Sequence, residues 1–154
     1  MSDEGGSLCE RCGLCCDGTL FQAVPIDETE AARLGSRIER CAEGMRQPCR
    51  ALQGCSCLVY VERPQTCRTY RCRALQEVEA GGTTVDEALE FVANVVERRR
   101  ALAELMGLED DREALQLARR RAKVGSLTEE QQTALDRLAR LLLILNFSRD
   151  HDSR

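Results

Sequence analysis

The sequence of 154 residues has no tryptophan, few other aromatic residues and a single histidine, His151, close to the C-terminus. One terminal histidine excludes a His-rich metal centre, the HExxH helix of metallohydrolases, and a nucleophile pair that needs a well-placed histidine. A large charge of one sign is also lacking, because 22 Lys and Arg face 26 Asp and Glu for a net charge of −4. We therefore expect no nucleic acid as a partner.

The chain also lacks a long hydrophobic run. Its longest aliphatic stretch is Leu141–Leu145, much shorter than the ~20 residues that a membrane-spanning helix needs. Residues 1–7 are polar and acidic, without the basic and apolar segments of a secretory signal. We expect a cytoplasmic protein with no membrane partner, in a compartment that keeps thiols reduced.

Cysteine is abundant in one half of the chain and absent from the other. All ten cysteines lie between Cys9 and Cys72, together with all three prolines and few long apolar side chains. In a reducing compartment this density predicts metal ligands rather than disulfides or inert buried thiols. Bound metal would also supply folding free energy that this half cannot obtain from apolar burial.

The predicted fold class is mainly α, with an irregular Cys-rich metal-binding N-terminal half packed on a C-terminal three-helix segment. The expected divisions are a disordered lead-in, the metal-binding module, the helical bundle segment and a tail: residues 1–7, 8–80, 81–147 and 148–154. In the module, the capping-box pair Asp27 and Glu30 predicts one short helix, which Gly35 ends. Leu58–Val61 predicts a short strand that ends before Pro64.

Three capping patterns predict the C-terminal helices: Thr84 with Glu87, Asp110 with Glu113, and Thr128 with Gln131. The helix over 128–146 is apolar almost all round at its end, which predicts deep burial, or a contact with a second copy or a protein partner. Two arginine triplets, 98–100 and 119–121, are expected on solvated helix faces, because nearby acidic residues offset their charge.

The first cysteine cluster is Cys9-Glu-Arg-Cys12-Gly13-Leu-Cys15-Cys16. A Cys-x2-Cys spacing lets two thiolates face one ion, and Gly13 permits the positive φ that aims backbone N–H groups at sulfur. The run also resembles the start of a [4Fe–4S] motif, but it lacks the Cys-Pro that completes one. Because Cys15 and Cys16 are adjacent, their side chains diverge, which predicts ligation of different ions or a bridging thiolate.

The second cluster contains five cysteines: Cys49, Cys55, Cys57, Cys67 and Cys72. Four arginines lie among and beside them: Arg63, Arg68, Arg71 and Arg73. We expect these arginines to offset the charge of gathered thiolates and to lower the thiol pKa values. If residues 67–72 are helical, Arg68 lies one turn from Cys72. Tyr60 and Tyr70 are expected to pack over the cluster.

Together these residues carry a resemblance. The sequence resembles the YkgJ-type cysteine-cluster family, whose suspected role is zinc or iron chelation through a CxxCxxCC motif. The residues that carry the resemblance are Cys9-x2-Cys12-Gly13-x-Cys15-Cys16, Cys49 and Cys57-x2-Tyr60-x2-Arg63-Pro64-x2-Cys67-Arg68-x-Tyr70-x-Cys72. It is also similar to the cluster region of flagellin lysine N-methylase, but no methyl-donor motif accompanies it here. The resemblance covers residues 9–72 and implies eight metal ligands: Cys9, Cys12, Cys15, Cys16, Cys49, Cys57, Cys67 and Cys72. Cys41 and Cys55 fall outside the pattern, either as spare thiols or, for Cys55, as a competitor of Cys57.

Three hypotheses about function follow. The first is a protein that holds zinc or iron through eight thiolates in a structural or metal-carrier role, since closed sites leave no open position for catalysis. The second is an iron–sulfur redox protein or enzyme that uses the cluster or a labile cysteine. The third is an interaction adaptor folded by its metal, with metal ions and a protein as partners. Ligand type alone does not choose among zinc, iron and an iron–sulfur cluster, and enzymatic activity stays open.

Overall fold

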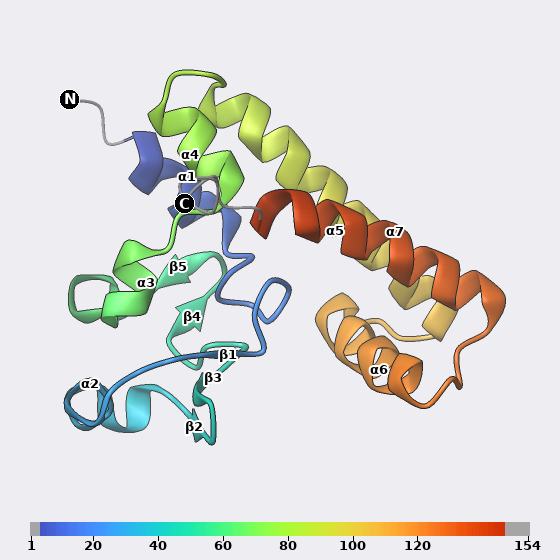
Figure 1. The fold of residues 1–154 in the computed structure, drawn as a ribbon, viewed down its shortest axis with the longest axis horizontal. Helices are drawn as coiled ribbons and strands as arrows, with labels where there is room; N and C mark the ends of the chain where they lie inside the picture. Colours follow the sequence, from blue (N-terminus) through green and yellow to red (C-terminus); the bar gives the residue numbers. More distant parts are fainter. Residues whose placement is uncertain (1–3, 147–154) are drawn as a thin grey trace, which may run out of the picture.

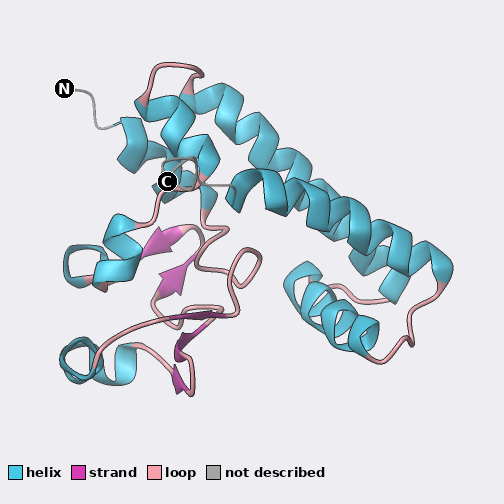
Figure 2. Ribbon diagram, viewed as in Figure 1, coloured by secondary structure: helices cyan, strands magenta, loops and turns pink. Residues whose placement is uncertain are grey.

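The computed structural model describes residues 4–146, and within that part of the chain there are seven α-helices and five short strands. Figure 1 shows two regions, three C-terminal helices on one side and a Cys-rich half of shorter elements on the other. Figure 2 shows how little of the protein is strand. The fold is mainly α with an irregular N-terminal half, which confirms the predicted fold class.

The C-terminal segment has three helices that begin where the capping patterns place them. They are α5, α6 and α7 (Val85–Met106, Asp111–Lys123 and Glu129–Asn146). The Thr84 hydroxyl accepts a hydrogen bond from the backbone N–H of Glu87, and α5 ends at Gly107 in the left-handed conformation that glycine favours. α7 runs back alongside α5 (Figure 1), and both contact α6. The three predicted helices are confirmed.

Aliphatic side chains from all three helices form the main core. Val95, Leu102, Leu115 and Leu138 are at most 1% exposed. The same core includes Leu14 from the Cys-rich half, so the two halves share one apolar core. None of the helices that the structure describes is long and apolar enough to cross a membrane. The division predicted near residue 80 falls in the turn between α4 and α5 and stays a prediction.

The Cys-rich half contains four helices, of which the capping patterns predict only the second. They are α1, α2, α3 and α4 (Glu4–Cys12, Glu28–Leu34, Gln65–Thr69 and Arg73–Glu79). α1 includes residues 4–7, where a disordered lead-in is predicted, because Leu8 is buried against α4 and α5 and holds the helix in place. The rest of the predicted lead-in, residues 1–3, and the predicted tail with His151 lie outside the described residues.

Five short strands form two small antiparallel sheets. They are β1, β2, β3, β4 and β5 (Ala23–Val24, Arg40–Cys41, Gly44–Arg46, Leu52–Gln53 and Ser56–Cys57), with the orders β1-β3-β2 and β4-β5. In the second sheet Leu52 lies opposite Cys57, so this hairpin carries one of the predicted ligands. Two short 3₁₀ turns, Gly35–Arg37 and Tyr60–Glu62, complete the half.

The strand predicted over Leu58–Val61 is wrong. Only Val59 of this run is well buried, at 4% exposure, whereas Leu58 and Val61 are 66% and 84% exposed. β4 pairs with β5, which ends at Cys57, and the chain then turns into the 3₁₀ segment. The apolar run therefore buries a single side chain instead of one face of a sheet.

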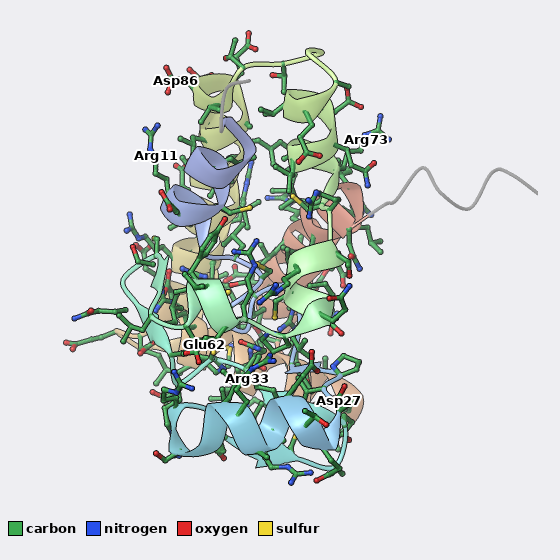
Figure 3. All side chains as sticks on the ribbon, turned by 90° about the vertical axis from the view of Figure 1, so that its left-hand side faces the viewer. Arg11, Asp27, Arg33, Glu62, Arg73 and Asp86 are labelled. Carbon is green, nitrogen blue, oxygen red and sulfur yellow. The ribbon has the colours of Figure 1, made fainter. Side chains whose placement is uncertain are left out.

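Polar contacts attach α2 to the segment that carries the later cysteines. The Glu30 carboxylate, part of the capping box of α2, also accepts a hydrogen bond from the backbone N–H of Gln65 at the start of α3 (2.6 Å). Arg33 donates to the carbonyl oxygen of Glu62 at 3.1 Å, and both residues are labelled beside α2 in Figure 3. The helix that the capping pattern predicts thereby orients α3, which carries Cys67.

Candidate metal centre

A cavity of about 280 Å³ lies among α1, the β4–β5 hairpin, α3 and the start of α4. Nine of the ten cysteines line it: Cys9, Cys12, Cys15, Cys16, Cys49, Cys55, Cys57, Cys67 and Cys72. These are the eight cysteines predicted as ligands, together with Cys55. Cys41 lies on β2 and is not among the lining residues. The fold thus brings the two sequence clusters to one place.

The first cluster sits on a helix end and the tight turn that follows it. Cys9 and Cys12 lie in the last part of α1, and Gly13 has the positive φ (71°) that its place in the motif predicts. The backbone N–H of Cys16 donates to the carbonyl oxygen of Gly13 at 3.0 Å. The turn brings Cys15 and Cys16 side by side, with their Sγ atoms 3.7 Å apart, so the prediction that their side chains diverge is wrong.

The cysteines of the second cluster come from separate parts of the chain. Cys49 is buried, and its backbone N–H donates to the carbonyl oxygen of Cys16 at 2.7 Å, which ties the two clusters together. Cys57 lies on β5, Cys67 on α3, and Cys72 caps the N-terminus of α4. The condition that residues 67–72 are helical is not met, because α3 ends at Thr69 and the chain is extended at the residue that follows.

Mutual electrostatic effects identify which cysteines are neighbours. In the first thiol group (Cys9, Cys12, Cys15 and Cys72), the thiolates of Cys15 and Cys72 raise the pKa of Cys9 and of Cys12. In the second thiol group (Cys16, Cys49, Cys57 and Cys67), the thiolates of Cys49 and Cys57 raise the pKa of Cys16 and of Cys67. Cys15 also raises the pKa of Cys67, so it lies between the two groups.

Burial outweighs the nearby arginines in setting the thiol pKa values. Desolvation is the largest effect and raises the pKa of Cys9 to about 11, and of Cys12 and Cys67 to about 12. Arg71 and Arg63 lower the pKa of Cys9, and Arg63 lowers that of Cys67, as the sequence predicts for these arginines. Burial raises both pKa values by more, so the net shift is upward. The pKa of Cys15 alone is lowered among these thiols, chiefly by its hydrogen bond with Cys16.

The other arginines of the second cluster have partners of their own. Arg68 donates to the backbone carbonyl oxygens of Arg63 (2.9 Å) and Val61 (2.6 Å), which closes the turn before α3. Arg73 pairs with Glu77 on the next turn of α4. These two arginines therefore stabilise the backbone that carries the cysteines.

Backbone N–H groups point at three of the sulfur atoms. The N–H of Leu75 donates to Cys72 Sγ at 3.4 Å. The backbone N–H of Leu14 lowers the pKa of Cys12, and the backbone N–H groups of Ala51 and Leu52 lower that of Cys49. Hydrogen bonds of this kind favour the thiolate over the thiol, which is the form that a metal ion binds.

The donor set fits a soft metal ion. Thiolates are the ligands that zinc, iron–sulfur centres and copper(I) prefer, and the N–H donors compensate part of their charge. Among residues 4–146, no three Cys, His, Asp or Glu side chains already converge into a finished ligand set. Ligation therefore requires thiol side chains to rotate toward a common point inside the cavity.

Both tyrosines pack at the cavity, as predicted. The Tyr70 ring meets Phe21 edge to face at 4.9 Å, and its hydroxyl donates to Asn146 Oδ1 at the end of α7. Burial raises the pKa of this hydroxyl. The guanidinium of Arg63 lies over the Tyr60 ring at 3.7 Å.

The structure also contains a buried ion pair beside the cysteines that the sequence does not predict. Asp17 and Arg99 are 2% and 4% exposed and form an ion pair. The prediction of solvated arginine triplets is wrong for Arg99 and for the half-buried Arg119, while Arg98 is exposed. The sequence shows Asp17 directly after two cysteines, but nothing near it in the sequence indicates that its partner is Arg99.

The fold and the cavity define a small, mainly helical protein with a thiol-lined centre suited to metal ions. A family model described as "CxxCxxCC: Putative zinc- or iron-chelating domain" matches residues 8–88. The chain belongs to this family, which confirms the resemblance seen in its cysteines. No curated protein and no solved structure matches the chain.

Proposed function

We propose that the protein binds two zinc or iron ions, one in each thiol group, in a structural or metal-carrier role. The observation that carries this proposal is the gathering of all eight motif cysteines around one cavity. Each group contains four thiols, which is the number that closes a tetrahedral site. A closed site leaves no open position for a substrate, which favours storage, transport or structure over catalysis.

Cys15 and Cys16 join the two groups. Their sulfur atoms are 3.7 Å apart, and Cys15 raises the pKa of thiols in both groups. At this separation the two thiols can bind two neighbouring ions or the same ion, and the metal content of the protein distinguishes these arrangements. In an alternative form of the proposal, the two ions share the thiolate of Cys15 as a bridging ligand.

The test is metal content after purification without oxygen or chelators. We expect about two ions per chain in the wild type, about one in Cys9→Ser and in Cys67→Ser, and about two in the matched control Cys41→Ser. Cys9 and Cys67 line the cavity from different groups, whereas Cys41 lies outside it. A folded wild-type protein without metal, or equal losses in all three variants, contradicts the proposal.

Cys55 favours a second candidate function, an iron–sulfur redox protein. Cys55 is exposed yet lines the cavity, so it offers a thiol in contact with solvent beside the eight others. Brown protein with iron and acid-labile sulfide supports this function, and colourless protein with zinc contradicts it. If Cys55 is a labile ligand of such a cluster, Cys55→Ser changes the visible absorption spectrum of the iron-bound protein, and an unchanged spectrum contradicts that role.

A further inference from the structure

A short buried segment follows the two adjacent cysteines and leads the chain toward the helical half. Asp17 and Thr19 are 2% and 1% exposed, although both are polar. An Asp17 side-chain oxygen accepts from the backbone N–H of Thr19 at 2.9 Å, and the backbone N–H of Asp17 donates to the carbonyl oxygen of Gly13. The segment is therefore folded tightly against the turn that carries Cys15 and Cys16.

A buried arginine on α5, Arg99, donates hydrogen bonds to the side chains of this segment. Arg99 Nη1 donates to Asp17 Oδ2 (2.8 Å) and to Thr19 Oγ1 (2.6 Å). Its Nε donates to Asp111 Oδ2 at 2.9 Å, and Arg112 pairs with Asp17 at 3.3 Å. The buried Asp17 thus faces two arginines and the buried Arg99 faces two aspartates, so neither buried charge lacks a partner of opposite sign.

The backbone of the same segment is bound by α6. Arg119 donates to the carbonyl oxygens of Gly18 (2.9 Å) and Thr19 (2.6 Å). Gln116 donates to the carbonyl oxygen of Gly18 at 2.8 Å. Side chains from two C-terminal helices therefore meet both the side chains and the carbonyl groups of residues 17–19.

We propose that Arg99 and Arg119 are positioning residues for the metal centre. By fixing residues 17–19, they fix Cys15 and Cys16, which are the point where the two thiol groups meet. This inference rests on the proposed binding of two metal ions. Both arginines lie beyond residues 8–88, so the inference gives the C-terminal helices a part in orienting the metal ligands that the family match does not cover.

The physical reason is the cost of ordering ligands. Ligands that are held in place before binding lose less conformational freedom when the ion arrives, and residues that orient ligands affect affinity strongly. When the hydrogen bonds to residues 17–19 are removed, the turn gains freedom that metal binding must then take away. Because Cys15 and Cys16 belong to different groups, both sites should weaken together.

The experiment is a titration of the full-length metal-free protein with Co²⁺ under reducing conditions, followed by thiolate-to-cobalt charge-transfer and d–d absorption. Arg99→Gln and Arg119→Gln are compared with the exposed neighbours Arg98→Gln and Arg120→Gln. We expect about tenfold weaker binding at both sites in the first pair, with altered d–d bands. The second pair should bind as the wild type does, and Arg119→Lys, which keeps a donor, should recover part of the affinity.

Far-UV circular dichroism separates positioning from folding. Arg119→Gln is expected to keep its helical signal, because Arg119 is half-buried and bonds only to carbonyl groups in this segment. If Arg99→Gln does not fold, the Co²⁺ affinity of Arg119→Gln alone tests the inference. Wild-type affinity and spectrum in a folded Arg119→Gln overturn the inference, as does equal weakening in the control pair. A wild type that binds no Co²⁺ instead contradicts the proposed function.

Discussion

The two halves of the protein reach order by different routes. In the C-terminal half, leucine and valine side chains from three long helices fill one core, and each helix begins at a local capping signal. In the Cys-rich half, strands are two or three residues long and the cysteines approach one another from distant parts of the chain. Apolar burial accounts for the order of the first half, whereas we expect the second to depend on bound metal as well.

Removing the metal should give the largest difference between the halves. Structural zinc sites contribute roughly 10 kcal/mol or more to the folding of small domains. We expect a strong chelator to make the backbone amides of residues 14–72 exchange faster than in the metal-bound protein, while the exchange of α5 and α7 stays unchanged. Hydrogen exchange with and without chelator measures this.

The control for chelation is re-addition of zinc, which should restore slow exchange in the Cys-rich half. Equal protection of residues 14–72 before and after metal removal would contradict the comparison. It would mean that the small apolar cluster around Val24, Leu34 and Met45 is enough to order this half.

The same contrast explains what the sequence predicts and what it does not. Thr84, Asp110 and Thr128 act within three residues of themselves, so a local pattern predicts the helices they begin. The partner of Arg99 is Asp17, 82 residues away in sequence, and no local pattern reveals such a pair. The motif names eight cysteines that the fold gathers, but their roles as ligands stay a prediction.

Alkaline pH should destabilise the metal-free protein through its buried thiols. The ordinary thiol pKa is 9.0, and burial raises the pKa of Cys12 and Cys67 to about 12. The folded state therefore holds these protons more tightly than the unfolded state, so their contribution is complete below pH 9 and is lost between pH 9 and 12. We expect Tm without metal to fall on the order of 10 °C over this window.

Thermal melting with a reductant and a chelator measures that fall. In Cys12→Ser/Cys67→Ser two of the titrating groups are gone, so the drop in Tm should be clearly smaller than in the wild type. An identical drop in both proteins would assign the effect to groups outside the cavity.

Gly13→Ala should disturb the Cys-rich half by a smaller amount. Gly13 has φ 71°, and an added Cβ would lie 3.3 Å from the Cα of Cys55. The left-handed conformation alone costs a non-glycine residue about 1–2 kcal/mol. Gly81→Ala is the matched control, since Gly81 has φ 75° with open space around it. Denaturant unfolding should give a similar loss in the free energy of unfolding for both variants. Only Gly13→Ala should also weaken metal binding. Equal metal affinity in the two variants would contradict a role for this turn in the site.

The smallest effect is expected at the end of α7, where the sequence predicts either burial or a contact with another chain. Leu142 and Leu145 are buried in the core, whereas Leu143 and Ile144 are 69% and 51% exposed. Ile144→Glu should therefore change the free energy of unfolding by no more than about 0.5 kcal/mol. Light scattering should give the monomer mass of 17.2 kDa for both the wild type and this variant. If the wild type is instead a dimer and Ile144→Glu is a monomer, α7 contacts a second copy of the chain through its exposed side.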